Sequence, residues 1–492
     1  MRAGPLARVC SGIAAGLLLW PSPGGAQDRA WPSERPPELL SPRPVNFPPY
    51  AVQTLANGLQ VVVVSHHEQP AVSIRMLVRA GAAYDPSGKP GVAGFMASLL
   101  DQGTTSRGAA EIADTVDFIG GRLSAGAGSD LTFVSAFVMK DSFEFGLDMV
   151  SDVARNPAFD PAELDRQRQQ GLSSMRVSYE DPEYIANVVF DRLVYGFHPY
   201  GMPIGGTPES IARITREDIL AFHERYFTPN NALLAVVGDV TAEEAFEAAR
   251  RVFGDWEPRE IDVPSLPEPP RPTRRVVVID KPDAVQTEVR VGHLGIRRKH
   301  EDYMAMNLAI KVLGGEGSNR LHRVLRTERG LTYGAQADFD TFFETGDIVA
   351  QTDTRSEATG EVLRLIVEEF FKMQRERPFP RELRDAKAYL TGTFPLTIET
   401  PDAIATQVLN VLFYELSLDE LETYRERVNE VTVEEIGRVA RAYLQPDRLS
   451  IVLVGNASAF QDQLRRAGFD RYEIIPLSEL DLFAANFRVS GR

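Results

Sequence analysis

The chain has 492 residues, 43% of them hydrophobic and 25% charged, which is an ordinary globular composition with room for roughly two to four domain cores. Its formal net charge of -16 argues against a nucleic-acid partner, because binding a phosphate backbone needs clustered cations. We therefore expect no nucleic acid among its partners.

The first 26 residues have the pattern of an export signal. Arg2 and Arg8 precede an apolar run, residues 13–20, that is too short to span a bilayer, and small residues at 23–26 offer a cleavage site. The only cysteine, Cys10, lies in this segment, so we expect a mature chain without disulfides or thiol catalysis. The pattern predicts a signal peptide over 1–26, a periplasmic or otherwise exported protein, and no membrane span.

A proline-rich stretch divides the remaining chain into two parts of similar length. Residues 258–273 predict an extended linker between a domain over 45–257 and a domain over 274–476. Each part opens with β-rich sequence, at 59–64 and 71–78 in the first and at 275–279 and 287–291 in the second. Amphipathic helices follow in both.

The ends of the two parts match closely. Four residues of the first recur 217 positions later in the second: Thr215, Tyr226, Pro229 and Gly238 as Thr432, Tyr443, Pro446 and Gly455. Each threonine is placed to cap a helix, which a proline turn and a buried strand follow. We predict an α+β fold of two homologous domains, each an antiparallel or mixed sheet packed with helices. The alternative is two unrelated α+β domains that share one helix-turn-strand ending.

The predicted helix that begins near Gly91 has a core-facing apolar stripe, which ends at Leu99 and Leu100. Its second face carries Gly94, Ala97 and Ser98, at the spacing where an inverted zinc motif, H-x-x-E-H, places two imidazoles and a carboxylate. None of these three small residues can bind zinc.

No other catalytic or metal motif stands out. The seven histidines include no pair at i, i+4 on a predicted helix, and His66-His67-Glu68 reads as a solvated turn. No G-x-S-x-G elbow follows a strand, which argues against Ser/His/Asp catalysis. The glycine-rich residues 314–317 lack the G-K-[ST] ending of a phosphate-binding loop.

The chain resembles the pitrilysin/insulinase (inverzincin) metallopeptidases, a family that includes the mitochondrial processing peptidase subunits. Residues 91–104, GVAGFMASLLDQGT, resemble the family's zinc-motif segment with its ligands replaced. Further matches are residues 197–201 with 205–207, 226–231, 238–240, 313–321 and 325–333. The resemblance covers the chain from about residue 50 to 456.

The resemblance implies a third zinc ligand, a Glu about 75 residues after the second histidine of the motif. Ser174 or Met175 stands there in this chain. With Gly94, Ser98 and Ser174 at the ligand positions and Ala97 at that of the general base, we expect the chain to bind no zinc and to be inactive alone.

The second part contains one pair of residues to which the resemblance gives a chemical role. The sequence predicts a helix from Gly317 to Gly330 and then a strand, with Arg326 and Tyr333 flanking the corner. The resemblance implies that such a pair, seven residues apart, projects toward the zinc of the opposing subunit and holds the scissile carbonyl. The spacing alone would favour a surface arginine with an ordinary strand tyrosine, whereas the surrounding Gly-Gly and Gly-Leu-Thr-Tyr matches favour the functional pair.

These observations suggest the non-zinc subunit of a periplasmic heterodimeric peptidase. Its expected partners are a zinc-bearing paralogous subunit, which would carry the Zn cofactor, and peptide or unfolded protein substrates. The alternative is a catalytically inactive structural or peptide-binding protein of the same family. A self-sufficient peptidase conflicts with the missing ligands.

Overall fold

The computed structural model describes residues 46–315 and 319–489, so the expected signal peptide and residues Gly317 and Ser318 lie outside the described residues. The strands of the described chain are β1 (Tyr50–Thr54), β2 (Gln60–Ser65), β3 (Ala71–Val78), β4 (Arg122–Ala127), β5 (Thr132–Met139), β6 (Ala232–Gly238), β7 (Arg275–Asp280), β8 (Gln286–Leu294), β9 (Ala335–Thr341), β10 (Gly346–Arg355), β11 (Ser450–Gly455) and β12 (Glu473–Pro476). Its α-helices are α1 (Val92–Ala97), α2 (Ala109–Phe118), α3 (Phe143–Arg155), α4 (Pro161–Ser178), α5 (Pro182–Tyr195), α6 (Pro208–Ile211), α7 (Arg216–Tyr226), α8 (Ala242–Phe253), α9 (Tyr303–Gly314), α10 (Thr359–Arg375), α11 (Pro380–Thr393), α12 (Pro401–Phe413), α13 (Asp419–Glu422), α14 (Tyr424–Glu430), α15 (Val433–Tyr443) and α16 (Ala457–Arg466).

Each half of the described chain builds one six-stranded mixed sheet. The strand order is β1-β2-β6-β3-β5-β4 in the first sheet and β12-β7-β11-β8-β10-β9 in the second. The inner strand β6 runs parallel to β2 and antiparallel to β3, just as β11 runs parallel to β7 and antiparallel to β8. Only the outer strand beside β2 or β7 differs, because β1 pairs antiparallel and β12 parallel. The shared order confirms the predicted α+β fold of two homologous parts.

Local sequence explains the matching ends of the two halves. Thr215 and Thr432 each accept a hydrogen bond from the backbone N–H three residues on, and the side chain there bonds back, which forms a capping box. The strands that follow, β6 and β11, are buried along their whole length. Their continuous apolar runs suit a position with helices on both faces.

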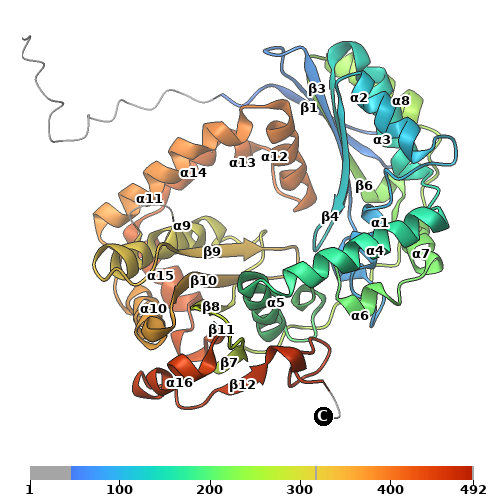
Figure 1. The fold of residues 1–492 in the computed structure, drawn as a ribbon. Helices are drawn as coiled ribbons and strands as arrows, with labels where there is room; N and C mark the ends of the chain where they lie inside the picture. Colours follow the sequence, from blue (N-terminus) through green and yellow to red (C-terminus); the bar gives the residue numbers. More distant parts are fainter. Residues whose placement is uncertain (1–45, 316–318, 490–492) are drawn as a thin grey trace, which may run out of the picture. The chain divides into compact units, whose positions relative to one another are not determined.

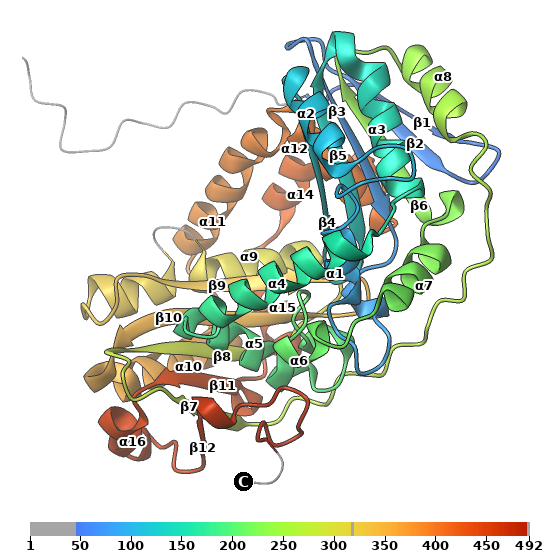
Figure 2. The same ribbon diagram turned by 45° about the vertical axis from the view of Figure 1, so that its right-hand side comes forward.

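The halves exchange one helix each. Helix α5 belongs to the first half in sequence but packs on the second sheet, where Val189 shares a buried cluster with Val452. Helix α12 comes from the second half and packs on the first sheet, where Leu409 shares a cluster with Val62. Figures 1 and 2 show α5 beside β8 and β11 and α12 beside β3 and β6. This exchange joins the described halves into one compact unit.

Two local features differ from, or extend, the sequence pattern. Helix α1 ends at Ala97, and Leu99 and Leu100 are buried in the turns that follow, so the apolar stripe outlasts the helix. Residues 258–273 run as irregular chain between α8 and β7. The domain limits built on that stretch stay a prediction.

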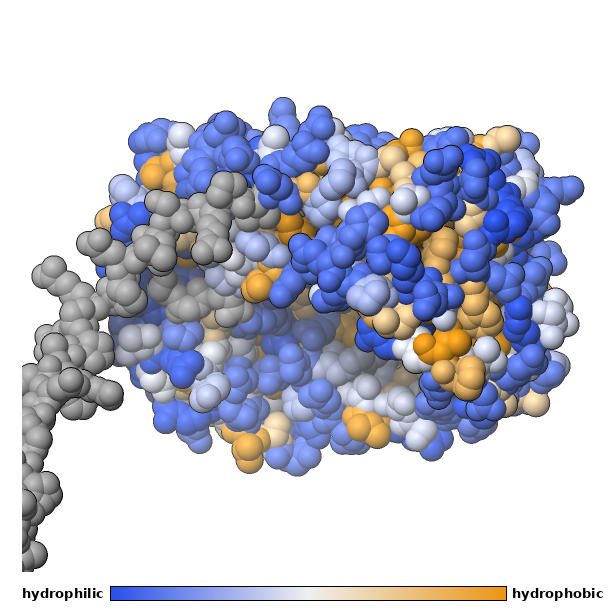
Figure 3. Space-filling model, turned by 90° about the horizontal axis from the view of Figure 1, so that it is seen from above, coloured by the Kyte–Doolittle hydropathy of each residue, from blue (hydrophilic) through white to orange (hydrophobic). Residues whose placement is uncertain are grey.

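The outer surface is mainly polar. In Figure 3 the described residues on the viewed face are mostly hydrophilic, and a hollow runs across the middle of that face. In the described part of the chain, no helix combines the length and the apolar character needed to cross a membrane.

Candidate functional site

The start of α1 is fixed by a buried carboxylate. Asp85 accepts hydrogen bonds from the backbone N–H groups of Gly91, at 2.6 Å, and Ala93, at 2.7 Å. Burial raises the pKa of Asp85 to about 7, although these N–H groups act against the rise. Gly91 has a φ of 99°, a left-handed conformation that favours glycine. The helix that carries the degenerate zinc positions is therefore held at a defined place.

Three of the four degenerate positions reach one recess of about 730 Å³. Gly94 and Ser98, in and just after α1, and Ser174 of α4 line this recess. Ala97 is only 1% exposed and is not among the lining residues. The helices thus gather the positions at one corner, which we call the α1 corner.

The residues of the α1 corner do not fit a zinc ion. A Cβ at Gly94 would lie 2.7 Å from the backbone oxygen of Ile204, so a histidine cannot enter there without moving that loop. The Ser98 hydroxyl donates to the Phe95 carbonyl oxygen at 2.7 Å. A zinc site needs three ligands from histidine, cysteine or carboxylate side chains. Over residues 46–315 and 319–489, no three such side chains are grouped to hold a metal ion.

The opposite wall of the same recess carries carboxyl groups that sequence reasoning missed. Asp191 of α5 and Asp340 and Asp347 of the β9–β10 hairpin line it, and no lysine, arginine or histidine is among its described lining residues. Tyr195 donates a hydrogen bond to Asp347 at 2.6 Å, which ties α5 to β10. Burial raises the pKa of Asp191 to about 7, and the nearby Asp340 adds to the rise. No local motif signals this cluster, because its members come from segments far apart in sequence.

The predicted pair in the second half is brought together in the structure. The π-helical turn η5 (His322–Thr327) carries Arg326, whose guanidinium carbon lies 4.8 Å from the centre of the Tyr333 ring. Tyr333 is 82% exposed and precedes β9, although the sequence pattern placed it in the strand. Arg326 Nη1 also lies 3.3 Å from Nε2 of His322. Helical segments of the π type are rare and frequently occur at functional sites.

The turn that carries Arg326 is anchored to α11. Arg320, only 5% exposed, donates two parallel hydrogen bonds of 2.8 Å to the carboxylate of Glu382. This contact holds the pKa of Glu382 below its usual range against the effect of burial. The amide oxygen of Asn319 accepts a hydrogen bond of 2.7 Å from the backbone N–H of His322. The bidentate Arg320–Glu382 pair fixes direction as well as distance, so it holds η5 rigidly against α11.

Holding Arg326 in one orientation needs more than the stack on Tyr333. Ordering a long arginine side chain costs about 1.5–2 kcal/mol of rotamer entropy. An exposed cation–π contact contributes about 0.5–1 kcal/mol. The contact with His322 adds to the stabilisation of this orientation.

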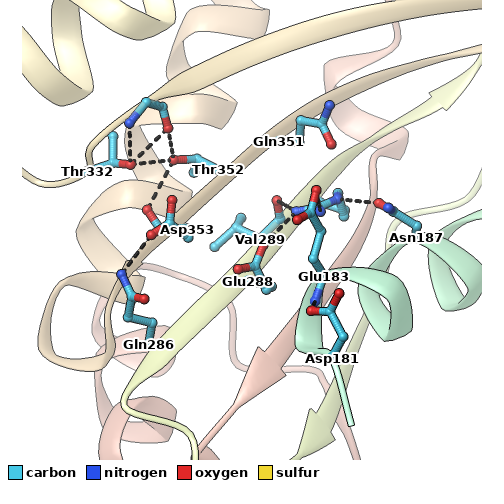
Figure 4. Close-up of polar contacts among 12 residues, drawn as sticks. Asp181, Glu183, Asn187, Gln286, Glu288, Val289, Thr332, Gln351, Thr352 and Asp353 are labelled. Atoms are coloured by element: carbon cyan, nitrogen blue, oxygen red, sulfur yellow. Dashed lines mark hydrogen bonds and ion pairs between the residues drawn. The ribbon is translucent and has the colours of Figure 1, made fainter. Parts of the chain in front are cut away.

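Arg326 and Tyr333 border a second recess of about 640 Å³, whose floor is a buried polar network. Arg290 of β8 is 2% exposed and donates to the side chains of Asn187, at 2.7 Å, and Glu288, at 3.1 Å. Figure 4 shows Asn187 on α5 reaching the side chains of the sheet. The network joins the exchanged helix to the strand beneath the pair. We call this region, with η5 and Tyr333, the η5 corner.

Two family models match the chain in consecutive segments. The model described as Insulinase (Peptidase family M16) matches residues 60–207, and the model described as Peptidase M16 inactive domain matches residues 213–390. Together these matches cover well over half of the sequence. The chain belongs to the insulinase family, peptidase family M16. It is a member that lacks the zinc motif, because Gly94, Ala97 and Ser98 stand where the motif has its ligands and base.

Known relatives of this M16 protein include bacterial zinc proteases. An uncharacterized zinc protease of Mycobacterium leprae is 28% identical over 80% of this chain and 88% of its own length. One of Bacillus subtilis is 24% identical over 80% of this chain and 95% of its own length. Each matches nearly the full length of the relative, so the similarity extends across both halves.

Solved structures support the same assignment. A crystal structure of a peptidase M16 inactive domain from Pseudomonas fluorescens has a TM-score of 0.78 and 29% identity, and covers 82% of this chain and 98% of that one. A chain of complex III from Candida albicans has a TM-score of 0.71 at 14% identity, and covers 85% of this chain and 99% of that one. The second likeness shows the shared fold alone.

Proposed function

We propose that this M16 protein is the zinc-free subunit of a periplasmic heterodimeric peptidase, in which a paralogous partner holds the zinc. The observation that carries the proposal is the contrast between the two corners. The α1 corner offers no metal ligand, whereas the η5 corner presents Arg326 stacked on an exposed Tyr333. A large exposed aromatic side chain and an exposed cation, held together on a rigid turn, suit contact with another molecule.

The two side chains have complementary roles in this proposal. When water adds to a peptide bond, negative charge grows on the carbonyl oxygen and must meet donors that are already in place. The Tyr333 hydroxyl can donate one such hydrogen bond. The Arg326 guanidinium, which carries several hydrogen-bond donors in a fixed fork, can hold a neighbouring carbonyl group of the peptide. The partner's zinc would supply the Lewis acid that this chain lacks.

The partner would also complete the peptide-binding surface. The chain alone presents a hollowed, mostly hydrophilic face, and polar side chains are among those that line the two recesses described above. An extended peptide or an unfolded protein segment, with many backbone donors and acceptors, suits such a surface. The Pseudomonas fluorescens structure is described as an inactive domain, which is consistent with a subunit that needs a catalytic partner.

Purification from the native host tests the proposal. Tagged protein should recover a paralogue of similar size that carries an intact H-x-x-E-H motif, and the eluate should cleave unfolded peptides. Recovery of this chain alone, without peptidase activity, would contradict the proposal. Fractionation of the same cells should place the protein in the periplasm.

The second candidate is a structural or peptide-binding protein without any catalytic role. The fold likeness to a chain of a respiratory complex favours it, because it shows that the same fold occurs in a large assembly. A stable multiprotein complex recovered in place of a peptidase heterodimer would support this candidate.

A further inference from the structure

We propose that His322 is a positioning residue whose imidazole holds Arg326 in place above the ring of Tyr333. The two side chains are four residues apart on η5, and Nη1 of Arg326 lies 3.3 Å from Nε2 of His322. For its role in turnover, this inference rests on the proposed function. The contact itself belongs to the isolated chain.

The chemistry of the contact determines which imidazole tautomer is present. A guanidinium has only donors, so Nε2 of His322 must be the acceptor and the ring proton must sit on Nδ1. The ring is neutral in this arrangement. A neutral acceptor orients Arg326 without cancelling its charge.

The ion pairs of the neighbouring arginines show how the contact of Arg326 differs from theirs. Four arginines lie between residues 320 and 329, and the other three pair with glutamates: Arg320 with Glu382, Arg323 with Glu328 and Arg329 with Glu361. Among the described residues, Arg326 makes no such ion pair; its polar contact is with His322. Its positive charge is thus held in a fixed direction and left available for a substrate carbonyl group.

The backbone of η5 supports the same arrangement. The N–H of Glu328 donates to the Arg323 carbonyl five residues earlier, at 2.9 Å, which is the π-type bond that widens this turn. The Asn319 amide and the Arg320–Glu382 pair anchor the segment, so the positions of His322 and Arg326 do not depend on each other's side chain. Substitution of His322 should therefore release the Arg326 side chain without unfolding the turn.

Three substitutions separate the chemical roles of the imidazole. His322→Gln keeps a neutral acceptor, His322→Leu removes it, and His322→Glu replaces it with a carboxylate. The glutamine variant should behave like wild type. The leucine variant should free Arg326, and the glutamate variant should hold Arg326 but neutralise its charge.

A spectroscopic measurement on the isolated chain tests whether His322 holds Arg326 against the ring of Tyr333. With ¹⁵N-labelled arginine, the Nε–Hε signal of Arg326, assigned through Arg326→Lys, should carry a ring-current shift that Tyr333→Leu abolishes. His322→Gln should keep the shift, and His322→Leu should lose it while the thermal midpoint stays at the wild-type value. An unchanged shift in His322→Leu would overturn the inference, whatever the protein's function.

Kinetics of the assembled heterodimer test the consequence. Loss of one orienting hydrogen bond of typical strength should raise KM about three- to tenfold in His322→Leu, with a smaller change in kcat, and His322→Gln should restore KM. The glutamate variant should also raise KM. If Tyr333 proves dispensable for turnover, the proposed function fails while the spectroscopic result on His322 still stands.

Discussion

The α1 corner and the η5 corner lie on segments that connect equivalent strands of the two sheets, β3 to β4 and β8 to β9, although α9 precedes η5 in the second segment. The α1 corner is closed by backbone, with the Ile204 carbonyl oxygen directly against Gly94. The η5 corner presents Tyr333 at 82% exposure, beside Arg326, which forms no ion pair with a carboxylate of residues 46–315 and 319–489. One fold can thus close a site with small residues in one half and display polar groups in the other.

The difference also shows what each corner can contribute to a reaction. At the α1 corner, the Ile204 carbonyl oxygen leaves no space for a longer side chain at position 94, so that ligand position is closed for steric as well as chemical reasons. At the η5 corner, ion pairs hold the backbone and leave the functional groups free. This comparison predicts that substitutions in the two corners affect different properties of the protein.

The largest effect is expected at the η5 corner, on turnover. Tyr333→Phe removes a hydrogen-bond donor aimed at developing charge, which should lower kcat of the assembled heterodimer by about a hundredfold to a thousandfold. Arg326→Ala should raise KM as well. Steady-state kinetics at equal amounts of assembled complex measure both. Wild-type kinetics in both variants would make the pair ordinary surface residues.

A large effect on stability is expected at the α1 corner. Gly94→His forces a side chain against the Ile204 carbonyl and should lower the free energy of unfolding by about 3 kcal/mol. The matched control is Gly171→His, in α4 on the same recess, because nothing lies within 4 Å of a Cβ there. Urea denaturation of the two variants measures their free energies of unfolding. Equal stability of the two variants would contradict the steric account.

The same steric conflict bears on attempts to rebuild the zinc site. The triple variant Gly94→His, Ala97→Glu and Ser98→His still lacks the third ligand at Ser174, so it should bind no zinc tightly and cleave no peptide. Metal analysis after dialysis against a chelator measures this. Stoichiometric zinc in the triple variant would show that the corner adapts more easily than its packing implies.

A smaller effect is expected from the anchor of η5. Glu382→Gln removes the charge that pairs with the nearly buried Arg320 and should destabilise the protein by about 2 kcal/mol. Glu361→Gln, which breaks the exposed pair with Arg329, is the control and should change stability by less than about 0.5 kcal/mol. Chemical denaturation of the two variants measures the loss of stability in each. Similar losses in both variants would mean that η5 does not depend on Arg320.

The smallest effect concerns pH. His198, only 2% exposed, accepts a hydrogen bond from the backbone N–H of Tyr200, and burial lowers its pKa from 6.5 to about 4. The unfolded chain therefore takes up a proton below pH 6.5 that the folded chain refuses, so stability is lost between pH 6.5 and 4.

His198→Asn isolates this contribution, because asparagine can cap the same N–H and does not titrate. The loss of stability between pH 7.5 and 5.5 should be about 1 kcal/mol smaller in the variant than in wild type. Urea denaturation at the two pH values provides the measurement. The same loss in both proteins would show that His198 takes up its proton normally when folded.

Local pattern predicted much of the fold. The apolar runs that became β6 and β11 and the helix caps at Thr215 and Thr432 were readable because each depends on neighbours within one turn or strand. The exchange of α5 and α12 was not readable, because an amphipathic helix shows which face is buried but not which sheet buries it.

The candidate site was likewise predictable only where motif spacing marked its residues. The small residues at Gly94, Ala97 and Ser98 and the pair Arg326 and Tyr333 stood out because motif spacing marked them. The carboxyl cluster of Asp191, Asp340 and Asp347 depends on tertiary placement, and the contact of His322 with Arg326 depends on the geometry of a π-type turn. Neither leaves a periodic signal in the sequence.

The central claim is that this chain supplies donors and a partner supplies the metal. Zinc analysis of the isolated mature chain and of the purified heterodimer, combined with a peptide-cleavage assay on both, tests it directly. The account predicts no stoichiometric zinc and no cleavage for the chain alone, and one zinc per heterodimer with activity. One tightly held zinc in the isolated chain, or cleavage by that chain without a partner, would contradict it.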